Sequence, residues 1–168
     1  PGGAGSVAGV DPSRAETRHS QGWVSKATDD LETSVRWMLE AAEKGEALSI
    51  AYQGNIVDLL EYLDSNDISV DLYSDQTSCH VPYDGGYTPA GVTFEEGRQL
   101  LASDREGFAK LVDESLIRHF HVLQRLTERG PASGVYATPS MKWASEPGRR
   151  EVPKNAADPP RASLRPRV

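Results

Sequence analysis

Residues 47–63 read ALSIAYQGNIVDLLEYL, and the hydrophobic period of this stretch changes in the middle. Residues 47–52 are mostly apolar and rich in strand-forming types, which is typical of a strand covered on both faces. A polar turn at residues 53–55 interrupts the run, and after it the apolar residues recur at helical spacing. The stretch therefore predicts a strand, a tight turn and a helix, which is the beginning of an α/β unit.

A second strand is expected after this helix. Residues 68–73 (ISVDLY) regain strand character, and we predict a strand near Val70–Tyr73. Two strands joined by one helix are almost always parallel, with a right-handed crossover. Because ligands of an open parallel sheet bind in the crevice beyond the carboxyl ends of its strands, residues 53–55 and 74–80 are the predicted site segments.

Helices are expected on both sides of this unit. Apolar residues within 28–45 form one helical stripe, and Asp29 and Glu32 have the spacing of a capping box. Residues 82–91, called here the Gly-rich loop, contain two prolines and three glycines and cannot form regular structure. Two helices are predicted after the loop, a short one and a long one: Phe94–Leu101 and about Arg105–Glu128.

Composition limits the classes of protein to which the chain can belong. The 168 residues fit one domain, and the single cysteine, Cys79, excludes a disulfide scaffold and fits a reducing compartment. No run of about 18 apolar residues exists, so we expect no membrane span. Residues 1–130 carry 11 basic and 22 acidic residues, and this acidic body predicts no nucleic-acid partner.

The last part of the chain differs from the rest. Residues 131–168 hold 7 of the 11 prolines and a net charge of +4, with few large apolar residues and no helical or strand period. This composition predicts a disordered tail.

The densest polar cluster is SDQTSCH at residues 74–80. Its hydroxyl, amide and backbone N–H groups suit phosphate or ribose oxygens. The alternative is a turn that satisfies its own backbone, although the position at a strand's carboxyl end favours a ligand site. Asn55 likewise has two interpretations, a helix N-cap alone or a cap that also contacts a cofactor. Cys79 and His80 could be a nucleophile and its base, but the side chains of adjacent residues in an extended loop point in opposite directions. We therefore expect Cys79 to be a packed, unreactive thiol.

Three motifs in order resemble one family. Residues 74–80, followed by Pro82 and by GGYTPAG at 85–91, resemble the DQTS(A/C)H…GGY-x-P signature of the urocanase (urocanate hydratase) family. LSI at residues 48–50, leading to Gly54-Asn55, is similar to the LS-(I/V/L)…GN segment of that family. The resemblance covers about residues 10–130, and the cysteine form of the motif resembles the eukaryotic-type branch.

This resemblance implies a fold and an activity. The fold is a Rossmann-like three-layer α/β domain, a parallel sheet with flanking helices, of which the chain holds an incomplete part. The activity is that of a lyase of histidine degradation, which hydrates urocanate to imidazolonepropionate with tightly bound NAD+ as an electrophile. The resemblance also implies that the complete enzyme is a cytoplasmic homodimer. Carried over by position, the expected NAD contacts are Asn55, Ile56, Gln76, Thr77, Ser78, Cys79, His80, Tyr87 and Thr88.

The sequence also departs from the family pattern. The family has an acidic residue, expected to hold a ribose, where this chain has Gly9, and its Gly-rich GAQ loop is reduced to residues 2–5. The later region with the family's active-site cysteine is absent, so no catalytic residue is assigned. We therefore expect a truncated Gly-rich start (1–9), a partial NAD-binding domain (10–130) and the tail (131–168). Two functions stay open: a fragment of urocanate hydratase, or a non-catalytic module for nucleotide binding or dimerisation.

Overall fold

A three-stranded parallel sheet forms the centre of the computed structural model, which describes residues 3–75, 81–129 and 136–137. The strands are β1 (Ala4–Gly9), β2 (Lys26–Thr28) and β3 (Leu48–Gln53), in the order β1-β3-β2. β3 is thus hydrogen-bonded on both edges. Its central residue Ile50 is fully buried, which explains why the strand has the apolar composition of a doubly covered strand.

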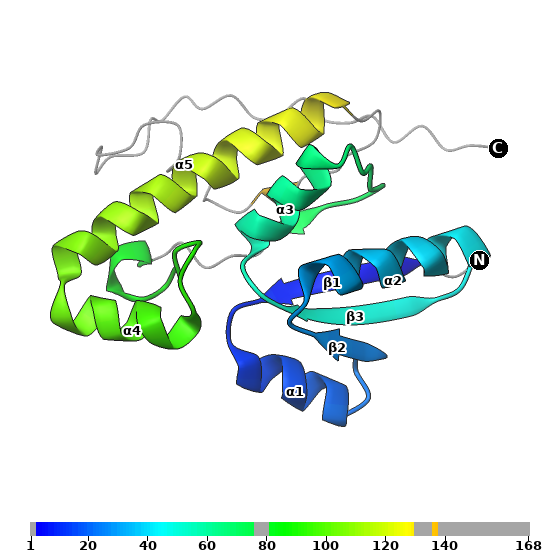
Figure 1. Cartoon of the computed structure of the whole chain (residues 1–168), viewed down its shortest axis with the longest axis horizontal. Helices are drawn as coiled ribbons and strands as arrows, with labels where there is room; N and C mark the ends of the chain where they lie inside the picture. The colour runs from blue at the N-terminus through cyan, green and yellow to red at the C-terminus, as the bar shows by residue number, and fades with distance from the viewer. Residues whose placement is uncertain (1–2, 76–80, 130–135, 138–168) are drawn as a thin grey trace.

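Helices cover both faces of this sheet, which makes three layers (Figure 1). Successive side chains of β3 point to opposite faces. Ala51 packs with Ala15 of α1 (Pro12–Ser20), and Tyr52 packs with Val35 of α2 (Leu31–Lys44). The predicted Rossmann-like three-layer α/β class is therefore confirmed.

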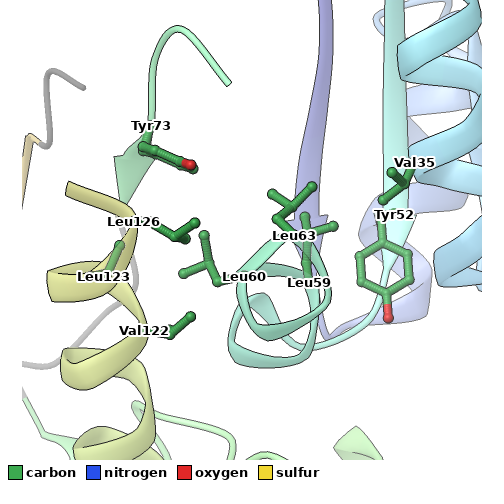
Figure 2. Packing of buried hydrophobic residues seen from close by; sticks show 9 residues of the cluster. All are labelled: Val35, Tyr52, Leu59, Leu60, Leu63, Tyr73, Val122, Leu123 and Leu126. Atoms are coloured by element: carbon green, nitrogen blue, oxygen red, sulfur yellow. The ribbon is translucent and has the colours of Figure 1, made fainter. Parts of the chain in front are cut away.

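A third helix packs between the sheet and a long C-terminal helix. Figure 2 shows the side chains of α3 (Ile56–Ser65) with Tyr52 and Val35 on one side and residues of α5 (Arg105–Arg129) on the other. The shared buried cluster consists of Val35, Tyr52, Leu59, Leu60, Leu63, Tyr73, Val122, Leu123 and Leu126. Burial of these side chains attaches α5 to the sheet through α3.

Ion pairs line the same helix contact. Arg118 of α5 donates two hydrogen bonds to the Glu61 carboxylate, at 2.9 and 2.7 Å. About two and three turns further along α5, Arg125 and Arg129 both pair with Asp64 of α3, whose side chain is only 10% exposed. The arginines are 42–49% exposed, so each pair adds little stability, and the buried apolar cluster holds the two helices together.

The predicted strand near Val70–Tyr73 is wrong. β1 and β2 occupy both edges of β3, so no edge remains for a strand that follows α3. Residues 68–73 run as irregular chain instead: Tyr73 and the half-buried Ile68 and Val70 pack on the α3–α5 cluster, while Leu72 is 61% exposed. The predicted βαβ unit of these two strands, with its right-handed crossover, is therefore absent from the described residues.

The first part of the chain holds more structure than the sequence indicated. The glycine-rich start contains β1, which pairs with β3 from Ala4 opposite Leu48 to Gly9 opposite Gln53. β1 was not predicted because small residues give no strand signal. The helix that follows β1 does have a recognisable start signal in the sequence. Asp11 accepts a hydrogen bond from the Ser13 N–H as the N-cap, and Pro12 follows it.

The other helix boundaries agree with the predictions to within a few residues. α4 (Phe94–Ser103) begins with a capping box between Thr93 and Glu96. The N-cap of α2 is Asp30, which accepts a hydrogen bond from the Thr33 N–H at 2.6 Å, so the predicted capping box from Asp29 is wrong by one residue.

Little of the tail falls within the described residues. β4 (Ser74–Asp75) pairs in parallel with β5 (Tyr136–Ala137). The other residues after Arg129 lie outside the described part of the chain, so the predicted disorder of the tail stays a prediction. Across the described ranges, no helix combines the length and the apolar character needed to cross a membrane.

We expect Leu63→Ala to lower the free energy of unfolding by about 2–5 kcal/mol, because Leu63 is 3% exposed at the centre of the α3–α5 cluster. Leu39→Ala is the matched control, since Leu39 is 43% exposed on α2, and its effect should stay within about 0.5 kcal/mol. Urea denaturation measures both. Equal losses would contradict the packing of α3 against α5.

Candidate functional site

Three helices begin at one edge of the sheet. Because β1, β2 and β3 are parallel, their carboxyl ends lie at the same edge. The N-caps Asp11, Asp30 and Asn55 follow these ends closely, and each side chain accepts a hydrogen bond from its own helix. This edge therefore gathers three helix N-termini, the arrangement at which open parallel sheets bind ligands.

Asn55 connects this edge to the Gly-rich loop. Its Oδ1 accepts a hydrogen bond from the Val57 N–H at 3.0 Å, which caps α3. Its Nδ2 donates to the Thr88 carbonyl oxygen at 3.0 Å, across 33 residues of sequence. The residue is 7% exposed. Asn55 and Thr88, two of the residues predicted to contact a cofactor, are thus in direct contact.

Gly54, just before Asn55, is required by a close contact. A Cβ atom at Gly54 would lie 2.2 Å from Cζ of Tyr52, because the tyrosine ring lies against Gly54. No side chain larger than hydrogen fits here without moving the ring. The Gly54-Asn55 pair therefore combines a steric need at the first residue with a hydrogen-bonding need at the second.

The Gly-rich loop also holds a fixed backbone path. Its short 3₁₀ turn, Pro82–Asp84, is followed by Gly85 with φ of 89°. At Gly86 a Cβ would approach the Val81 carbonyl oxygen to 2.8 Å, and Gly91 has φ of 83°. Gly85 and Gly91 have left-handed backbone conformations that other residues rarely adopt, and any side chain at Gly86 would clash with the Val81 backbone.

α5 supports this loop from the far side. The Tyr83 hydroxyl donates to the Asp113 carboxylate at 2.6 Å, and the Ala90 N–H donates to Ser115 Oγ at 2.9 Å. Tyr87 is 2% exposed and packs in a second apolar cluster with residues of α5: Phe108, Val112 and Leu116. The loop is therefore anchored on α5 and joined to the sheet edge through Asn55.

The electrostatic field differs along the edge. Burial raises the pKa of the Tyr52 phenol, and the negative charges of Asp58, Asp30 and Asp29 raise it further. Burial also raises the pKa of Asp58, which the Arg118 guanidinium opposes. The part of the edge near β2 is thus acidic, and it suits hydroxyl groups or cations better than phosphates.

The structure brings together some of the predicted site residues. Asn55, Ile56 and Thr88 lie at the carboxyl end of β3, and the Tyr87 ring points into the second apolar cluster. The predicted contacts within residues 76–80 lie outside the described part of the chain: Gln76, Thr77, Ser78, Cys79 and His80. Because residues 70–73 form no strand next to β3, sheet topology no longer places residues 74–80 at this edge.

Sequence reasoning missed the contributions of β1 and β2 to this edge. Asp11 and Asp30 stand at the carboxyl ends of strands that it did not predict. Asp11-Pro12 is a helix-start signal that could have located the first cap, whereas the helix start after Thr28 was predicted one residue early, at Asp29. Within the described ranges, no group of three or more His, Cys, Asp or Glu side chains has metal-ligand geometry.

Comparison with known families and proteins gives one consistent result. Residues 1–152 match the family described as the urocanase Rossmann-like domain. The chain is 39% identical over 155 residues to a probable urocanate hydratase of Caenorhabditis elegans, covering 92% of this chain and 23% of that protein. It is 43% identical over 129 residues to the urocanate hydratase of Mus musculus, covering 74% and 19%. The chain thus spans about a fifth of the length of these relatives.

We expect the Tyr83 phenol to titrate far above its usual range, because burial and the Asp113 carboxylate raise its pKa from 10.0 to about 12. The stabilisation from this neutral phenol is fully present below pH 10 and is lost as the pH rises toward 12. Asp113→Asn should lower the pKa while burial keeps it above 10.0. Phenolate absorbance, with Tyr83→Phe to assign the signal, measures both, and titration near 10 in the unmodified chain would contradict the contact.

Proposed function

Since the chain belongs to the urocanase family, we propose that it forms the NAD+-binding part of a urocanate hydratase, with the cofactor at the carboxyl edge of β1, β2 and β3. The observation that carries this proposal is the contact between Asn55 at the start of α3 and Thr88 of the Gly-rich loop. Two segments that are far apart in sequence, and that the family resemblance connects with NAD+, meet at the edge where Rossmann-like sheets bind ligands.

The chemistry of the described residues fits a dinucleotide. Asn55 keeps a second Nδ2 hydrogen, and Thr88 adds a hydroxyl, so both can bond to ribose or amide oxygens. Tyr87 contributes through its backbone in this proposal, because its ring is buried among apolar residues. Ile56 offers an apolar contact beside the amide of Asn55. By resemblance, the remaining contacts are Gln76, Thr77, Ser78, Cys79 and His80.

Charge indicates which part of the cofactor suits each part of the edge. The acidic side near Asp29 and Asp30 repels the pyrophosphate and suits the ribose hydroxyls or the cationic nicotinamide. The α3 N-terminus and the Gly-rich loop offer backbone and amide N–H donors, and the one carboxylate in the first turn of α3, Asp58, is paired with Arg118, so this side suits the phosphates better. We therefore propose that the pyrophosphate lies on the side of α3 and the Gly-rich loop.

The proposed reaction of the whole protein is the hydration of urocanate in histidine degradation. Bound NAD+ supplies an electrophile in this chemistry rather than a hydride acceptor. The residues of this chain hold and orient the cofactor, and other parts of the protein complete the substrate site. We further propose a cytoplasmic homodimer, as the family resemblance implies.

A second candidate is a module that binds nucleotide without catalysis or serves in dimerisation. It rests on the fold, because the described residues form a Rossmann-like sheet to which no catalytic residue is assigned. Both candidates predict no turnover by the isolated chain. A urocanate hydratase in which this chain replaces the matching segment separates them, because the first candidate predicts turnover of urocanate and the second predicts none.

Calorimetric titration tests the cofactor site. We expect NAD+ to bind the chain, more weakly than a complete urocanate hydratase, and expect Gln76→Ala with Thr77→Ala to weaken binding about ten-fold or more through lost hydrogen bonds. Gln124→Ala with Thr127→Ala removes the same side-chain types from α5 and should leave the affinity unchanged. Equal binding by both double variants would remove residues 76 and 77 from the contacts, and no binding by the unmodified chain would overturn the proposal.

Urocanate absorbs in the ultraviolet, so its loss reports hydration directly. We expect the isolated chain with NAD+ to show no turnover, because hydration needs the cofactor held against substrate in a closed pocket. A complete urocanate hydratase serves as the positive control for the assay. Measurable turnover by the chain would overturn the proposal that other segments complete the site.

A further inference from the structure

The Asn55 side chain makes two hydrogen bonds that serve different parts of the structure. We propose that Asn55 is a positioning residue: its amide N–H holds the Gly-rich loop at the carboxyl edge of β3 and thereby sets the distance between the groups that bind the nucleotide. The effect on NAD+ rests on the proposed function, whereas the effect on the loop rests on the geometry alone.

The chemistry of the cap explains why an asparagine is needed. Asp, Ser and Thr cap helices about as well as Asn, so capping alone does not select the residue. An Asp carboxylate accepts but cannot donate, and a Ser hydroxyl is too short to span the cap and the loop together. Asn accepts from the Val57 N–H with one atom and donates to the Thr88 carbonyl with another. The contact with Thr88 therefore accounts for the amide.

Two other hydrogen bonds of the loop lead to α5 and not directly to β3. Tyr83 bonds to Asp113, and the Ala90 N–H bonds to Ser115, so both tie the loop to α5. α5 in turn reaches the sheet through the packed side chains of α3. The bond from Asn55 to Thr88 joins the loop to the second residue after β3, and this shorter connection fixes the loop at the carboxyl end of the strand.

The surroundings make this bond costly to lose. Asn55 is 7% exposed, so water does not easily replace the Thr88 partner. The Asn55 backbone adopts the extended N-cap conformation, with φ of −79° and ψ of 138°, and its side chain is held over the first turn of α3 by the Val57 N–H. The amide is therefore held in the direction of the loop before any ligand binds.

Asn55→Asp separates the two hydrogen bonds. The variant keeps the shape and the helix cap, loses the donor and brings a carboxylate oxygen against the Thr88 carbonyl. We expect exchange of the Ala90 amide hydrogen, measured by NMR, to become about ten-fold faster or more, while exchange at Val57 stays within about two-fold. The NAD+ affinity, measured by calorimetry, should fall about ten-fold.

Asn66→Asp is the matched control. Asn66 donates its Nδ2 to the Tyr62 carbonyl at 2.9 Å, on the exposed opposite end of α3. The substitution introduces the same charge and removes the same kind of bond, so the Ala90 amide and the NAD+ affinity should not change. A similar loss in this variant would overturn the proposal, because the effect would then come from charge on α3.

Two further variants keep the test decisive. Asn55→Ala removes cap and donor together, so exchange at both Val57 and Ala90 should accelerate. If Asn55→Asp fails to fold, Asn55→Ser serves in its place, because its hydroxyl caps α3 and does not reach Thr88.

The outcomes discriminate between this inference and the proposed function. Unchanged exchange at Ala90 in the Asp or Ser variant overturns the role of Asn55 in holding the loop. Faster exchange with unchanged NAD+ affinity overturns its role in nucleotide binding. Failure of the unmodified chain to bind NAD+ overturns the proposed function, and the exchange at Ala90 then still decides whether Asn55 holds the loop.

Discussion

Within the described residues, β3 is enclosed along most of its length: β1 and β2 pair with its two edges, and α1, α2 and α3 pack on its faces. A strand enclosed in this way must be apolar along its length, as Leu48–Gln53 largely is. Its carboxyl end is therefore the place where the chain can turn polar. The steric demand of Tyr52 at Gly54 and the two bonds of Asn55 are concentrated in the two residues that follow.

α5 gives this arrangement its rigidity. One end of the helix packs its apolar residues against α3, and the other end packs against the Gly-rich loop around Tyr87. The ion pairs of Arg118, Arg125 and Arg129 lie at the rim of the first contact. A loop rich in glycine thereby keeps a defined path next to the site, which lowers the entropy that a ligand must remove on binding.

The carboxyl edge offers different chemistry along its length, and this difference bears on a dinucleotide. Burial raises the pKa of the Tyr52 phenol, and so do the carboxylates of Asp58 on α3 and of Asp30 and Asp29 after β2, of which only Asp58 is paired with an arginine, Arg118. Amide, hydroxyl and backbone groups gather where α3 meets the Gly-rich loop. A ligand with hydroxyls at one part and phosphates at another matches this division better than a simple anion does.

Elements with local signals can be predicted from the amino-acid sequence alone. The apolar run before Gln53, the Asn55 cap and the glycines at 85, 86 and 91 specify the strand, the helix start and the loop, because period, capping and backbone conformation act over a few residues. Strand neighbours are not local. Residues 68–73 have strand composition, yet β1, made of small residues, occupies the edge of β3, and only tertiary packing decides between them. The bond from Asn55 to Thr88 spans 33 residues, so only the folded chain could show that the cap also holds the loop.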